Sequence, residues 1–185
     1  MATSSSRAIG PDGGELDAEI VPVGGEMPFR VTPAAAGLHL LQLRAGWNVA
    51  TLEMGDQPHA YVAGAQAPLQ TVGQVERLYF FVPPGTTRLT LTASASVTGE
   101  GLLLRVLDPE GQVVVEREGD FDKPEAVRVP VGAGQAGRVW SLALLPPKAP
   151  GLHLDDVKLF LGAPLPPYLA ARPEWAERFG RRVTQ

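Results

Sequence analysis

Apolar and polar residues alternate along the middle of this chain, in short segments that end at turns. In Arg88–Ala95, leucine and alanine take every second position, and arginine, threonine and serine take the others. Alternation with a period of two over about four to eight residues is typical of a strand with one buried face. Three neighbouring apolar segments complete a predicted antiparallel meander: Arg77–Val82, Leu102–Leu107 and Val113–Glu116.

Proline and glycine mark the turns of this meander. Pro83-Pro84-Gly85 follows the first segment, and Asp108-Pro109-Glu110-Gly111 follows the third. The second tetrad suits a type I turn, because proline fixes φ at the second position and glycine allows the chain to leave the turn.

Short apolar segments continue on both sides of the meander. Those predicted as strands are Glu19–Val23, Phe29–Thr32, Gly37–Arg44, Trp47–Leu52, His59–Ala63, Ala126–Val131, Val139–Leu145 and His153–Leu161. Residues 64–73 and 119–124 are expected to be loops, and the glycine-rich residues 132–137 a flexible turn. About ten strands at a spacing of roughly 8–12 residues predict an all-β protein, an antiparallel β-sandwich of the jelly-roll type.

The two ends of the chain differ from this central part. Residues 1–14 are rich in serine, glycine and proline and are expected to be flexible. Residues 15–162 form the predicted sandwich domain. Residues 163–185 are expected to form a proline-rich spacer, which begins with Ala163–Pro167, and a short helix.

The predicted helix is Glu174–Arg182. Pro173 suits the first helical position, and Glu174 favours the first turn through the helix dipole. Trp175, Arg178 and Phe179 follow a spacing of three and four residues, so the helix has an apolar stripe. This stripe either packs on the sandwich or begins a neighbouring domain.

Composition narrows the classes of function. Glycine (21) and proline (18) make up about a fifth of the 185 residues, which argues against long helices. The net charge is −4 and no basic stripe is present, so nucleic acid is not an expected partner. No apolar run is long enough to span a membrane. Cysteine is absent, which removes disulfides and thiolate chemistry.

Catalytic motifs are missing from the sequence. No G-x-S-x-G segment occurs, and His39, His59 and His153 lack the spacing of metal ligands. His39 and His153 lie in predicted strands and are interpreted as structural. Neighbouring acids such as Glu116 and Glu118 lie at strand edges or in loops, where solvated carboxylates are common. We therefore predict that the protein is not an enzyme.

Two segments resemble known families. Tyr79–Gly111, with Val-Pro-Pro-Gly and then Leu-Arg-Val-Leu-Asp-Pro-Glu-Gly, resembles the bacterial pre-peptidase C-terminal-type sandwich domain. Leu152–Leu161 (LHLDDVKLFL) resembles the closing strand of galactose-binding-like jelly rolls, which include many carbohydrate-binding modules of bacterial polysaccharide-degrading enzymes. The resemblance implies a secreted protein, located outside the cell or in the periplasm as part of a larger polypeptide.

The second resemblance also implies a structural calcium ion. In many such modules an acidic pair on the closing strand helps to hold calcium, and the matching residues here are Asp155 and Asp156. Calcium takes six to eight oxygen ligands, so a further acid such as Glu15 or Asp17 is needed. The alternative is that the pair lies at a solvent-exposed turn or bulge.

A sugar-binding site needs exposed aromatic rings with polar groups at the rim. The best candidate cluster for a polysaccharide or oligosaccharide is Trp47, Asp56, His59 and Tyr61, although these rings could equally fill the sandwich. Trp140 alternates with leucines and is expected in the core. At Tyr79-Phe80-Phe81 one ring must point outward.

The leading hypothesis is a non-catalytic carbohydrate-binding accessory module that contacts other domains of the same polypeptide. Two alternatives remain open: a structural spacer, or a subunit-contact domain with no ligand of its own. The apolar content of 44% leaves room for such a contact face.

Overall fold

The computed structural model describes residues 4–21, 31–33, 35–44, 51–95 and 97–183. The chain divides into two compact units, Met1–Gly55 and Asp56–Gln185. This division differs from the single sandwich domain that the sequence predicted over residues 15–162.

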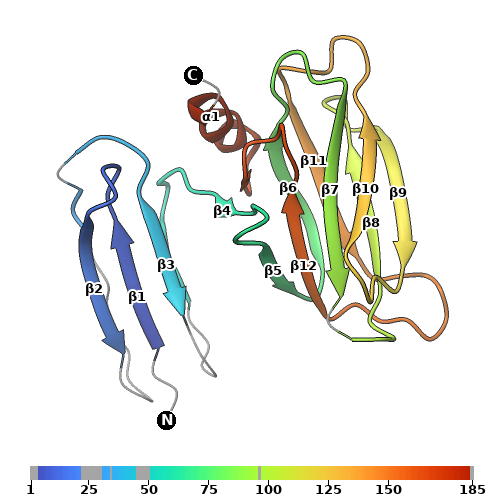
Figure 1. The fold of residues 1–185 in the computed structure, drawn as a ribbon, viewed down its shortest axis with the longest axis horizontal. Helices are drawn as coiled ribbons and strands as arrows, with labels where there is room; N and C mark the ends of the chain where they lie inside the picture. Colours follow the sequence, from blue (N-terminus) through green and yellow to red (C-terminus); the bar gives the residue numbers. More distant parts are fainter. Residues whose placement is uncertain (1–3, 22–30, 34, 45–50, 96, 184–185) are drawn as a thin grey trace. The chain divides into compact units, whose positions relative to one another are not determined.

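The first unit contains a three-stranded antiparallel sheet in the order β2 (Glu15–Val21), β1 (Ser4–Ile9) and β3 (Leu40–Arg44). Residues 4–9, which were expected to be flexible, form its central strand (Figure 1). The alternation in β1 is carried by small residues, Ser6 and Ala8, which are buried. Because serine and alanine are weak markers of a strand, the pattern was missed.

Several sequence predictions for this unit concern residues outside the described ranges. Phe29, the first residue of one predicted strand, and residues 45–50 lie outside these ranges. The predicted strand Trp47–Leu52 is therefore described only at its last two residues, which form no strand. The predicted strand Gly37–Arg44 is present in its second half, as β3.

The second unit contains two four-stranded antiparallel sheets (Figure 1). The first sheet has the order β10 (Glu125–Pro130), β7 (Arg88–Ala95), β12 (Asp156–Leu161) and β5 (Leu69–Val72). The second sheet has the order β6 (Val75–Phe81), β11 (Val139–Leu145), β8 (Leu102–Leu107) and β9 (Val113–Gly119).

The order of these eight strands is that of a jelly roll. The chain crosses between the sheets at every connection except the hairpin from β8 to β9. As a result β12, the last strand, lies between β5 and β7, and β11 lies between β6 and β8. The predicted fold class is confirmed. Strands β7, β8 and β11 begin and end at the residues predicted from the sequence.

Side chains from both sheets form one buried apolar cluster. Trp140 belongs to it, as predicted, and is 1% exposed. The largest fully buried side chains of the cluster are Trp140, Phe80, Leu89, Leu91, Leu102, Leu104, Leu142, Leu144, Leu159, Leu169, Val82 and Val106.

Two short elements depart from the prediction. Strand β5 lies within residues 64–73, which were expected to be a loop. Its four residues pair with β12, so tertiary pairing outweighs the weak local signal around Pro68. Strand β4 (Tyr61–Val62) is shorter than expected and pairs with β13 (Tyr168–Leu169).

Helix α1 (Pro173–Val183) packs on the second sheet. Trp175 and Ala176 form a small buried cluster with Ala170, and Tyr79 and Val139 pack against this cluster from the sheet. Of the two alternatives left open for the apolar stripe of this helix, the structure shows the first: the stripe packs on the sandwich.

Candidate functional site

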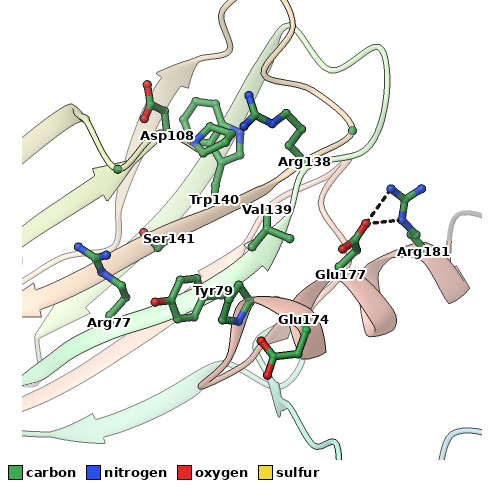
Figure 2. Close-up of a pocket in the computed structure, with 14 residues that line it drawn as sticks. Arg77, Tyr79, Asp108, Arg138, Val139, Trp140, Ser141, Glu174, Glu177 and Arg181 are labelled. Carbon is green, nitrogen blue, oxygen red and sulfur yellow. Dashed lines mark hydrogen bonds and ion pairs between the residues drawn. The ribbon is translucent and has the colours of Figure 1, made fainter.

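A groove of about 620 Å³ lies between α1 and the outer face of the second sheet (Figure 2). Its floor is formed by Tyr79, Val139 and Ser141. One side is formed by α1, with Glu174 and Glu177, and the other by Arg138 and the turn at residues 108–111.

Strand alternation explains why these side chains face the groove. In β6, Leu78 and Phe80 point into the core, so Arg77 and Tyr79 point outward. In β11, Trp140 and Leu142 are the core residues, so Ser141 lies on the outer face, where it is paired in register with Tyr79.

The edge of the second sheet places the helix beside Tyr79. The backbone N–H of Tyr79 donates to the Ala170 carbonyl at 2.8 Å, and the N–H of Ala170 donates back to Tyr79 at 2.9 Å. This bridge covers the outer edge of β6 and directs the chain into α1 only a few residues later. Local backbone pairing therefore holds the chain that leads into α1 beside Tyr79.

Charged groups of the groove are partly neutralised by one another. Glu177 accepts hydrogen bonds from Arg181 at 2.9 Å, and Arg138 pairs with Glu110. Arg77, Glu174 and the Tyr79 hydroxyl have no side-chain hydrogen bond or ion pair within the part of the chain that the structure describes. These three groups are therefore available to a ligand.

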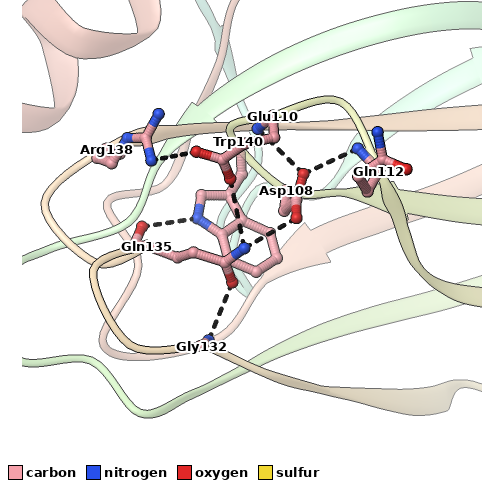
Figure 3. A network of polar contacts seen from close by, with 7 residues as sticks. All are labelled: Asp108, Glu110, Gln112, Gly132, Gln135, Arg138 and Trp140. Atoms are coloured by element: carbon pink, nitrogen blue, oxygen red, sulfur yellow. Dashed lines mark hydrogen bonds and ion pairs between the residues drawn. The ribbon is translucent and has the colours of Figure 1, made fainter.

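A network of polar contacts holds the far side of the groove in place (Figure 3). Asp108 accepts hydrogen bonds from the backbone N–H of Glu110 at 3.0 Å and of Gln112 at 2.8 Å, and from Gln135 Nε2 at 2.8 Å. The Gln135 carbonyl accepts from Trp140 Nε1 at 3.0 Å. The glycine-rich turn at residues 132–137, expected to be flexible, is thus tied to the 108–112 turn.

The structure describes three of the four residues of the predicted ligand cluster, Asp56, His59 and Tyr61. Trp47 lies outside the described residues. The His59 ring packs against Trp175, with 4.5 Å between ring centroids, and its Nδ1 lies 2.8 Å from the Gln57 carbonyl. Tyr61 is 48% exposed on β4, and Asp56 is exposed in the preceding turn. His59 thus helps to pack α1, whereas Tyr61 stays accessible.

The predicted calcium ligands lie at the start of β12. Asp155, which precedes the strand, and Asp156, its first residue, are both exposed. In the first unit, Glu15 forms an ion pair with Arg7 at 2.5 Å. No group of three acidic or histidine side chains suited to a metal ion occurs among the described residues. The calcium site stays a prediction.

The two remaining histidines differ from each other. His153, predicted within a strand, is exposed and forms an isolated bridge with Glu100 before β12 begins. His39, in the first unit, buries its Nε2 without a hydrogen-bond partner among the described residues.

Displaced pKa values occur away from the groove. Hydrogen bonds from Arg105 and Lys148 lower the pKa of Glu116, and the Glu125 carboxylate raises the pKa of Arg117. Both groups lie on β9, which is the edge strand of the second sheet farthest from β6.

No protein-family model matches the sequence, and no curated protein matches it significantly. Within the described residues, no helix has the length and apolar character needed to cross a bilayer.

Most groove residues could not have been selected from the sequence. Arg77, Ser141 and Glu174 belong to three segments that only the fold brings together. The sequence did indicate an outward-facing ring near Tyr79, because three consecutive aromatic residues in a strand must place at least one ring on the outer face.

Proposed function

We propose that this protein is a non-catalytic accessory module that binds carbohydrate in the groove between α1 and the second sheet. The observation that supports this proposal is the partly buried ring of Tyr79 on the groove floor. Apolar C–H faces of a pyranose pack well on an aromatic ring of this kind.

Polar groups beside Tyr79 complete the chemistry of a sugar site. Arg77 can donate hydrogen bonds to sugar oxygens, and Glu174 can accept them from sugar hydroxyls. Neither group forms an ion pair within the described residues, so binding does not require an existing pair to break. A volume of about 620 Å³ is within the usual range for small-ligand sites.

The proposal is tested by affinity electrophoresis in native gels that contain neutral soluble glycans. We expect at least one glycan to retard the protein, and Tyr79→Ala to weaken retardation by roughly tenfold in dissociation constant, about 1.4 kcal/mol. Tyr61→Ala is the matched control, because Tyr61 is an exposed tyrosine outside the groove.

Each other outcome has a definite meaning. Loss of retardation in Tyr61→Ala but not in Tyr79→Ala would move the site to the cluster predicted from the sequence, which includes Asp56 and His59. Absence of retardation across a broad glycan panel would reject carbohydrate binding and favour a structural spacer. Concentration-dependent mass in light scattering would favour a subunit-contact domain.

The proposed setting is a larger secreted bacterial hydrolase, outside the cell or in the periplasm. This setting follows from the resemblance of Leu152–Leu161 to jelly rolls attached to such enzymes.

Calcium is proposed separately, at Asp155 and Asp156. If it binds there, calcium chloride raises the melting temperature, a chelator lowers it, and Asp155→Ala abolishes both shifts. An unchanged melting temperature in chelator would reject the metal.

A further inference from the structure

The outer face of the first sheet carries a group of cations that lack partners. Alternation in β7, β10 and β12 places Arg88, Arg128 and Lys158 on this face, opposite the core residues of the same strands. All three are exposed, and none forms an ion pair or a side-chain hydrogen bond among the described residues. Asp156, the first residue of β12, is the acidic residue that these strands place on the same face.

Several other cations of the second unit are paired with carboxylates. The ion pairs Arg105–Glu116, Arg117–Glu125 and Arg138–Glu110 neutralise cations elsewhere on its surface. The whole chain has 16 basic and 20 acidic residues, yet this face has an excess of basic ones. A face of this charge attracts an anionic partner.

The groups between the cations are suited to sugars. Thr90, Thr92 and Ser94 form a row of partly exposed hydroxyl side chains along β7. Phe160 lies directly opposite Thr92 and is also partly exposed. Hydroxyl groups exchange hydrogen bonds with sugar hydroxyls, and an aromatic ring packs against the apolar face of a sugar ring.

The register indicates the size of the ligand. Arg128 is paired with Thr90, and Lys158 is paired with Ser94, four residues farther along β7. At about 3.3 Å per residue the two cations are separated by roughly 13 Å along the strand. A polymer with repeated charges can reach both cations, whereas a single small anion cannot.

We propose that the outer face of the first sheet binds an acidic polysaccharide, with Arg128 and Lys158 contacting its carboxylate or sulfate groups and Phe160 contacting a sugar ring. Guanidinium groups bind carboxylates through paired hydrogen bonds, which favours arginine in this role. This site is separate from the α1 groove and does not depend on it.

The first experiment is affinity electrophoresis of the full chain in gels that contain polygalacturonate. We expect retardation that weakens as salt rises, and a loss of roughly tenfold in affinity in Arg128→Gln combined with Lys158→Gln. The control combines Arg178→Gln with Arg182→Gln, which removes the same charge from exposed positions on α1. Equal loss in both double variants, or no loss in the first, would overturn the proposal.

A second pair of variants tests whether the ligand is a polysaccharide. Phe160→Leu is expected to weaken binding roughly fivefold, while Phe160→Tyr, which keeps a ring, retains it. Unchanged affinity in Phe160→Leu, or equally tight binding of poly-glutamate or of single-stranded DNA, would reject the polysaccharide. Tyr79→Ala leaves polygalacturonate retardation unchanged, so failure of the groove proposal and failure of this one are distinguished.

Discussion

The carboxylate of Asp108 joins two turns at one end of the sandwich. It is 9% exposed and accepts three hydrogen bonds, two from the backbone of its own turn and one from Gln135. Hydrogen bonds to a charged group are stronger than neutral ones, and an unpaired buried donor is costly. This residue therefore stabilises the far side of the groove without needing to contact a ligand.

We expect Asp108→Ala to lower the free energy of unfolding by about 3 kcal/mol, because three hydrogen bonds to a charged acceptor are lost. Urea denaturation followed by tryptophan fluorescence measures the change. Asp122→Ala is the control, since Asp122 is exposed and has no side-chain hydrogen bond among the described residues. A similar effect of both variants would contradict the role given to Asp108.

Glu116 gives the protein a pH-dependent contribution to stability. Hydrogen bonds from Arg105 and Lys148 lower the pKa of Glu116 from its ordinary value of 4.5. The contribution is complete above that value and is lost as the pH falls through the lower pKa of the folded state. Melting temperatures measured against pH should differ between wild type and Glu116→Gln above pH 4.5 and converge in stronger acid. A constant difference at every pH would contradict this assignment.

At the scale of elements, α1 depends on a close approach to the second sheet. A Cβ atom added at Gly180 would lie 2.2 Å from the Cβ of Phe81, so only glycine allows this packing distance. The helix also has Glu174 in its first turn and Arg181 and Arg182 in its last, which suits the helix dipole. The groove therefore depends on Gly180 for its helix side.

Gly180→Ala should lower the melting temperature, with a loss of about 1–3 kcal/mol from overpacking. The sign of the change in stability is informative. Helix propensity alone would make Gly180→Ala stabilising, because alanine favours a helix over glycine by up to about 1 kcal/mol. Arg178→Ala, at an exposed position of the same helix, should change stability by only a few tenths of this amount. Stabilisation by Gly180→Ala would show that α1 does not pack as described.

At the scale of the whole molecule, the second unit contains both buried apolar clusters in their entirety. Its sheets close a jelly roll from strands within residues 69–161, and α1 covers one side. A unit with a complete core of its own has the properties of an independent domain.

Residues 56–185 expressed alone should therefore fold. We expect a cooperative urea transition and a near-ultraviolet circular dichroism signal from the buried Trp140 and Trp175. A broad transition without near-ultraviolet signal would show that the remaining residues are needed to complete the fold.

The regular strands were predictable because their alternation is local. Arg88–Ala95, Leu102–Leu107 and Val139–Leu145 begin and end in the structure where the pattern of the sequence places them. β1 and β5 were missed because one is built from small residues and the other has only four residues beside a proline. Such segments become strands through the partners that the fold provides.

The sequence by itself determined the all-β class, the main strands and turns, the core position of Trp140 and the C-terminal helix, because each depends on residues close together in the chain. Only the tertiary structure decided that α1 packs on the sandwich, that His59 packs against Trp175, and that Arg77, Tyr79 and Glu174 line one groove. These relations join residues far apart in sequence, and they depend on strand order and register, which local periodicity does not encode.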